Sequence, residues 1–137
     1  MHKIDFEIAE QEFNRFCDLW EIDNDVENMN DEDRNAFNSQ KFKIINSIKR
    51  GRLILEDDES LTYIFARPEL SGCETIKISR PVGSGLIAMD RYKDREGMHK
   101  TYAVLGGMTG KDASFFSKLD GIDLKLFMAV IALFLAS

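Results

Sequence analysis

The sequence predicts an α+β fold that is mainly α-helical, with helices packed around a small antiparallel β-hairpin or three-stranded sheet. Two observations lead to this prediction. Apolar residues recur at helical spacing in both the first and the last third of the chain. Between them lie three short, β-prone runs separated by turn residues, at 52–56, 61–65 and 75–79.

The chain is expected to form a single domain, residues 1–137. Its length of 137 residues and hydrophobic fraction of 44% are enough for a core without disulfides or metals, since a chain of this size buries roughly 70% of its unfolded surface. The domain divides into an N-terminal helical part at about 5–50, a β-hairpin at about 52–66 and a C-terminal helical part at about 75–137.

Two helices are predicted in the N-terminal part, at 5–20 and 31–50, joined by an acidic, Asn-rich loop. In the second helix, Asn30 or Asp31 can cap the first turn, and Gly51 stands at the position that favours a left-handed end. The apolar faces that should meet in the core are Ala9, Phe13, Phe16 and Trp20 in the first helix, and Phe37, Ile44, Ile45 and Ile48 in the second.

The hairpin is predicted from the acidic tetrapeptide at 57–60, which separates two β-prone runs, and a third strand at 75–79 ends at Pro81. Further on, a short helix opens at Ser84 or Gly85, and a longer one is capped by Asp94 and broken at Gly106-Gly107 and Thr109-Gly110. A single turn at 113–116 and a final helix at 122–135, capped by Asp120 or Asp123, complete the chain.

No residue pattern indicates catalysis, so we expect no catalytic residue, no cofactor and no metal site. The histidines are His2 and His99, and neither lies in a metal-ligand spacing. Ser114 and Ser117 have no neighbouring histidine to activate them. The glycine-rich run at 106–111 lacks the spacing of a phosphate-binding loop. The protein is therefore predicted not to be an enzyme.

The charge and the apolar segments also limit the partners. A formal net charge of -6 argues against general nucleic-acid binding and against adsorption to anionic lipid. The apolar run at 126–136 is shorter than the roughly 20 residues that cross a bilayer, so no membrane partner is expected. Cys17 is predicted to be a buried free thiol, and Cys73 lies in a loop. With no apolar signal segment at 1–5, these two cysteines favour a reducing, intracellular compartment.

The final helix is apolar around its whole circumference, so every side of it must be covered. One interpretation places it at the centre of the core. The other gives one of its faces to a second chain, for self-association or for binding a client. The candidate protein-interaction residues in that second case are Phe127, Ile131, Phe134 and Leu135.

Three segments of the C-terminal half occur in an order that points to a family. A strand ends in Arg80-Pro81, a helix stops at Met108-Thr109-Gly110, and Leu119-Asp120-Gly121-Ile122-Asp123 precedes a terminal apolar helix. This order resembles the tail assembly chaperones of long-tailed bacteriophages, in which the helix stop is Leu-Thr-Gly. The resemblance covers about the last 65 residues well and the remainder loosely.

The resemblance implies a function, partners and a location. Such chaperones bind the tape measure protein, keep it soluble and help to recruit major tail tube subunits. They act in the cytoplasm of the infected bacterial host and are absent from the mature virion. Two alternatives stay open: another phage or prophage structural component, such as a connector or tail-completion protein, and a regulatory protein-binding module. Self-association of the chain also stays open.

Overall fold

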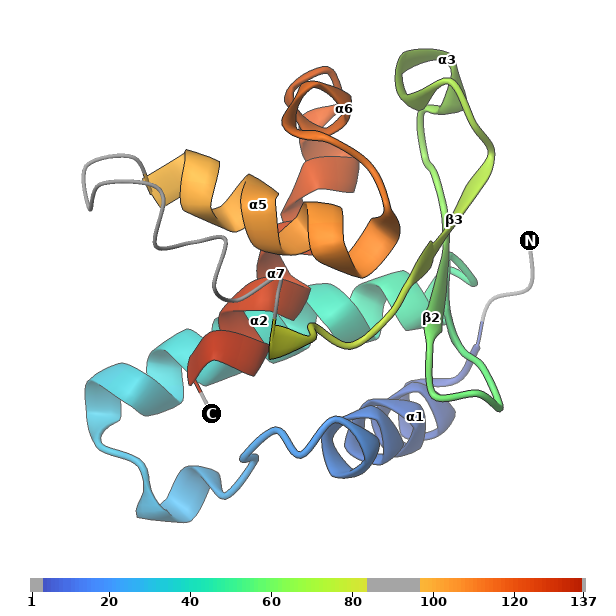
Figure 1. The fold of residues 1–137 in the computed structure, drawn as a ribbon. Helices are drawn as coiled ribbons and strands as arrows, with labels where there is room; N and C mark the ends of the chain where they lie inside the picture. The colour runs from blue at the N-terminus through green and yellow to red at the C-terminus, as the bar shows by residue number, and fades with distance from the viewer. Residues whose placement is uncertain (1–3, 84–96, 137) are drawn as a thin grey trace.

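The computed structural model describes residues 4–83 and 97–136 and confirms the mainly helical α+β fold (Figure 1). Three β-strands form one antiparallel sheet in the order β1-β2-β3. The described elements are α1 (Phe6–Leu19), η1 (Val26–Asn28), α2 (Asp31–Lys49), β1 (Leu53–Leu55), β2 (Leu61–Ile64), α3 (Pro68–Ser71), β3 (Thr75–Ile78), α5 (Gly97–Thr109), α6 (Ala113–Ser117) and α7 (Gly121–Ala136).

Helices α1 and α2 form an antiparallel pair, as their predicted apolar faces require. The Phe13 and Phe37 rings meet edge to face with centroids 6.1 Å apart. One turn further along, Lys41 Nζ lies 3.4 Å from a Glu10 carboxylate oxygen and 5.7 Å from the centre of the Phe13 ring. Lys41 therefore covers the apolar contact with its stem while keeping its charged end at the surface.

Both predicted ends of α2 are confirmed. The Asn30 side chain accepts a hydrogen bond from the Asp33 N–H at 2.7 Å, which caps the first turn. At the other end, Gly51 adopts a φ of 74° and its N–H donates to the Ile48 carbonyl. Because a side chain disfavours that left-handed conformation, glycine suits the position.

The sheet presents one buried face to the helices. Tyr63 pairs with Leu53 on one side and Ile76 on the other, and all three side chains are buried. The alternating residues Ile54 and Lys77 are exposed on the outer face. This alternation is the pattern of a sheet with one face on the core and one in solvent.

Helix α7 lies at the centre of the molecule, against α2 on one side and α5 on the other (Figure 1). The Phe127 ring approaches Tyr63, Phe65 and Phe116 with centroid distances of 5.6, 6.0 and 5.5 Å. These contacts join the sheet, α6 and α7 in one aromatic cluster. An all-round apolar helix is thus accommodated by neighbours on several sides.

The predicted break at Gly106-Gly107 is wrong, because α5 continues through both residues to Thr109. The helix ends at the other predicted break, Thr109-Gly110, where Gly110 has a φ of 76°. Gly106 has a different role: a Cβ there would lie 2.7 Å from the Lys111 carbonyl oxygen. The glycine lets the chain turn closely over the last turn of α5.

One of the two predicted caps of α7 is confirmed, one short helix was not predicted, and one predicted helix lies outside the described residues. Asp120 caps α7 through the Ile122 N–H at 2.8 Å, whereas Asp123 is buried and serves a different purpose. The short helix α3, which begins at Pro68, was not predicted. The predicted helix opening at Ser84 or Gly85 lies outside the described residues, as does Asp94.

Candidate protein-binding site

A cleft of about 630 Å³ opens where the end of α1, the β1–β2 turn, the segment after β3 and the end of α7 converge. We call it the Trp20 cleft, after the aromatic side chain in its wall. Its volume lies within the roughly 300–1,000 Å³ of typical ligand pockets. The apolar residues that line it are Trp20, Pro81, Val82 and Phe134.

Trp20 is fixed in place by three contacts. Its ring lies 4.9 Å from that of Phe16 and meets Phe134 edge to face at 6.2 Å, measured between centroids. Its indole Nε1 donates a hydrogen bond of 2.8 Å to the Glu59 carbonyl oxygen. Only 2% of Trp20 is exposed. Because the Trp20 side chain is already held in one position, little conformational entropy is lost when a partner binds against it.

Two ion pairs stand on the rim. Lys77 Nζ lies 2.8 Å from Asp58 Oδ2, and Arg80 Nη2 lies 3.0 Å from Glu59 Oε2. Arg80 also donates to the Leu19 carbonyl at 2.9 Å, which ties the segment after β3 to the end of α1. Hydrogen bonds from Lys77 and Ser60 hold the pKa of Asp58 well below its usual range.

The backbone at the cleft is strained in two places. Among the described residues, Glu21 and Glu59 are the non-glycine positions with positive φ, at 53° and 72°, and both line the cleft. A left-handed conformation costs a residue with a side chain roughly 1–2 kcal/mol. Strain of this kind tends to occur at functional positions, which favours a binding role for this cleft.

The structure divides the four residues predicted for protein interaction. Phe127 is fully buried and Ile131 is 3% exposed, so the prediction is corrected for these two: they belong to the core, as the alternative interpretation held. Phe134 is half-buried and lines the Trp20 cleft. Leu135, the next residue, is 44% exposed.

Sequence reasoning missed the remainder of the cleft. Trp20 was assigned to the core, and the acidic turn containing Asp58 and Glu59 was treated only as a connection. One signal did exist: Arg80 and Pro81, which end the strand motif of the family resemblance, both line the cleft. Nothing in the spacing could show that this segment meets the end of α1.

A buried polar cluster at the start of α7 has a structural role. The Asp123 carboxylate accepts hydrogen bonds from the Tyr63 hydroxyl and from the N–H groups of Ala66 and Arg67, at 2.5, 2.7 and 3.1 Å. Burial, and then the hydrogen bond to Asp123, raise the pKa of Tyr63 above its usual range. The carboxylate satisfies backbone donors where β2 ends.

The described residues contain neither a metal-binding cluster nor a membrane-spanning helix. Within 4–83 and 97–136, no group of three or more His, Cys, Asp or Glu side chains could hold a metal ion. None of the helices in those ranges is long and apolar enough to span a membrane.

In comparisons with known proteins, the chain matches no protein-family model, no curated protein and no solved structure.

Proposed function

We propose that this chain is a non-catalytic protein-binding protein, and specifically a phage tail assembly chaperone. In this proposal it binds the tape measure protein, keeps it soluble during tail assembly and helps to recruit tail tube subunits. The observation that carries the proposal is the Trp20 cleft, in which an apolar wall is surrounded by paired charges. Such a combination suits recognition of a polypeptide.

The position of the family motifs supports the specific form of the proposal. Arg80 and Pro81 come from the strand motif, and Phe134 comes from the terminal helix. Segments that are more than 50 residues apart in sequence therefore line one cleft. In this proposal, the strand motif and the terminal helix both contribute residues to the surface that binds the client.

The exposure of the apolar residues fits a reversible contact. Val82 is 59% exposed at the cleft and Leu135 is 44% exposed beside Phe134. A chaperone must release its client when tube subunits arrive, which favours a modest interface over a large obligate one. The net charge of -6 would help to keep a complex with an apolar client in solution.

Co-expression with a tape measure protein from the same phage tests the proposal. The wild-type chain should keep that protein in the soluble fraction, and Val82→Glu should reduce the soluble amount because it places a charge at the apolar wall. The matched control is Ile8→Glu on α1, a position of similar exposure (50%) away from the cleft lining. If the client precipitates equally with and without the wild-type chain, the chaperone function is wrong.

A second measurement separates the proposal from a structural role. Mass spectrometry of purified virions should show the tape measure and tube proteins without this chain. Stoichiometric presence of the chain in the particles would instead identify a connector or tail-completion protein.

A further inference from the structure

A second pocket lies between α2, α7 and the acidic segment at 21–33, and it has a different character from the Trp20 cleft. Its apolar lining includes Ala132 and two buried residues that form the floor, Phe37 of α2 and Leu133 of α7, whereas Ala36 is exposed and lies at the mouth. Met29, half-buried, forms one wall. We call it the Met29 pocket. Its volume of about 240 Å³ is below the roughly 300–1,000 Å³ of small-molecule sites, so it suits one or two apolar side chains.

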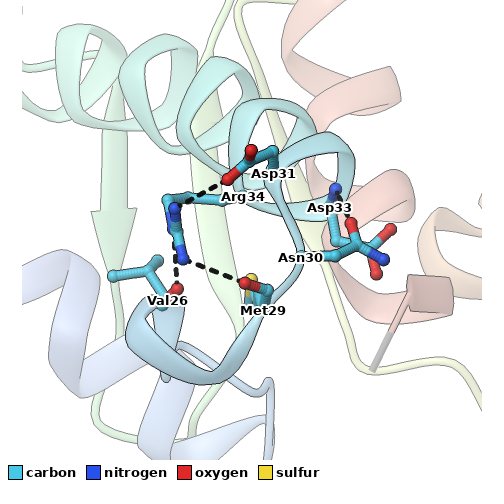
Figure 2. A network of polar contacts seen from close by, with 6 residues as sticks. All are labelled: Val26, Met29, Asn30, Asp31, Asp33 and Arg34. Carbon is cyan, nitrogen blue, oxygen red and sulfur yellow. Dashed lines mark hydrogen bonds and ion pairs between the residues drawn. The ribbon is translucent and has the colours of Figure 1, made fainter.

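The wall of this pocket is fixed by Arg34. Its Nε and Nη2 donate to the carbonyl oxygens of Val26 and Met29, each at 2.9 Å, and its Nη1 lies 3.1 Å from Asp31 (Figure 2). Figure 2 shows these contacts holding the η1 loop against the first turn of α2. The pocket therefore has a preformed wall, which lowers the entropy cost of binding.

Among the described residues that line the pocket, the charged side chains are acidic. Segment 21–33 contains seven acidic residues and no Lys or Arg. Asp23 and Asp33 line the pocket and are exposed. Arg34, the first basic residue after the segment, directs its guanidinium to Asp31 and the loop carbonyls. A partner that places positive charges beside this pocket would meet a complementary potential.

We infer that the Met29 pocket binds an apolar side chain carried by a basic helical segment of the client protein. The inference rests on the proposed function in taking the tape measure protein as that client. The apolar floor supplies binding energy, since desolvation of an anchor side chain is the main source of affinity at such sites. The acidic rim selects segments in which Lys or Arg flanks the anchor and disfavours acidic segments by like-charge repulsion.

Peptide binding tests the chemistry of the occupant. Overlapping peptides of about 20 residues, roughly 30 Å as helices, would span the tape measure protein and be labelled for fluorescence anisotropy. The tightest binders should carry net positive charge and an apolar stripe, and their affinity should fall as salt is raised. Two designed helical peptides, one with Leu and Lys and one with Leu and Glu, provide a probe that does not depend on the client. The Lys peptide should bind about tenfold more tightly or better.

Three variants test whether the peptides bind at the Met29 pocket. Ala36→Arg fills the mouth with a large cation at an exposed helix position and should weaken the basic peptides by about tenfold or more. Asp33→Asn should weaken them less and reduce the salt dependence. Glu32→Gln removes an equal charge from an exposed neighbour that does not line the pocket, and should weaken binding less than Asp33→Asn does. Circular dichroism confirms that each variant is folded.

The outcomes separate this inference from the proposed function. Acidic peptides as the tightest binders, or Ala36→Arg binding like the wild type, would overturn the inference. If wild type and Ala36→Arg keep the client equally soluble, the chaperone function stands and the Met29 pocket is not its client site. If the wild type fails to keep the client soluble, the chaperone function fails, whatever the designed peptides show.

Discussion

The Tyr63 hydroxyl donates a 2.5 Å hydrogen bond to the Asp123 carboxylate, a residue 60 positions later in the chain. Tyr63 is 1% exposed and Asp123 is fully buried. The same carboxylate accepts hydrogen bonds from the N–H groups of Ala66 and Arg67. One side chain in the first turn of α7 thus ties that helix to the end of β2, and this positions the helix that carries Phe134 to the Trp20 cleft.

Loss of the hydrogen bonds to Asp123 should destabilise the folded protein. Tyr63→Phe should lower the free energy of unfolding by about 1.5–3 kcal/mol, because it removes a hydrogen bond to a charged group. Asp123→Asn should lower it by at least a similar amount, since the amide presents a donor where the site supplies only donors. Urea denaturation measures both. The control Asp120→Asn keeps a good helix cap and should change stability by less than about 0.5 kcal/mol.

The two ends of the predicted interaction set should behave differently. Phe127→Ala should cost about 3–5 kcal/mol, because the ring is fully buried. Leu135→Ala, at a position 44% exposed, should change stability by less than about 1 kcal/mol. Thermal and urea denaturation measure the contrast. A chain cut after Asp123 should fail to fold, and a folded truncated monomer in light scattering would contradict the central place of α7.

Relief of backbone strain at Glu59 should offset the usual cost of introducing glycine. Glu59→Gly removes the side chain from a residue with a φ of 72°, which returns roughly 1–2 kcal/mol. Loss of the exposed ion pair with Arg80 offsets at most about 1 kcal/mol of this. The added unfolded-state entropy of glycine offsets roughly 0.5–1 kcal/mol more, so the melting temperature should stay nearly constant. Asp57→Gly, in the same turn but without positive φ, should lower it, since glycine there adds only unfolded-state entropy.

Acid should destabilise the protein partly through two exposed carboxylates. Hydrogen bonds lower the folded-state pKa of Asp58 and of Asp112. As the pH falls through the usual carboxyl range, the unfolded chain takes up these protons first, so the stability that the two groups contribute is lost below that range. Urea midpoints measured between about pH 7 and pH 2 should decline less steeply in the Asp58→Asn/Asp112→Asn double variant than in the wild type.

The two cysteines should differ in reactivity. Burial raises the pKa of the Cys17 thiol from 9.0 to about 12, and the side chain is 1% exposed. Cys73 is half-buried. Alkylation at neutral pH should therefore modify Cys73 first and Cys17 only as the protein opens, because the thiolate is the reactive form. Mass spectrometry of a labelling time course measures the order, with Cys73→Ser as the control.

The sequence by itself determined the local elements. The periodicity of Phe13 and Phe16, the Asn30 cap and the glycine at 51 define α1 and α2 to within a residue or two, since caps and hydrophobic spacing act over a few neighbouring residues. The hairpin and the third strand followed from alternation and turn residues for the same reason. The prediction at Gly106-Gly107 was wrong because glycine signals both a helix break and a close backbone approach, and sequence spacing does not distinguish them.

Only the tertiary structure decided the rest. An apolar helix must be covered, but its sequence does not say by what, so Phe127 and Ile131 proved to be core whereas Phe134 and Leu135 reach the surface. From its sequence position Asp123 could be a helix cap, but in the structure it is a buried hydrogen-bond acceptor. Its donors Tyr63, Ala66 and Arg67 lie in β2 and just after it, far away in the sequence. The Trp20 cleft and the Met29 pocket likewise join segments far apart in the chain. Such sites depend on packing between distant segments, and local sequence patterns carry no information about that packing.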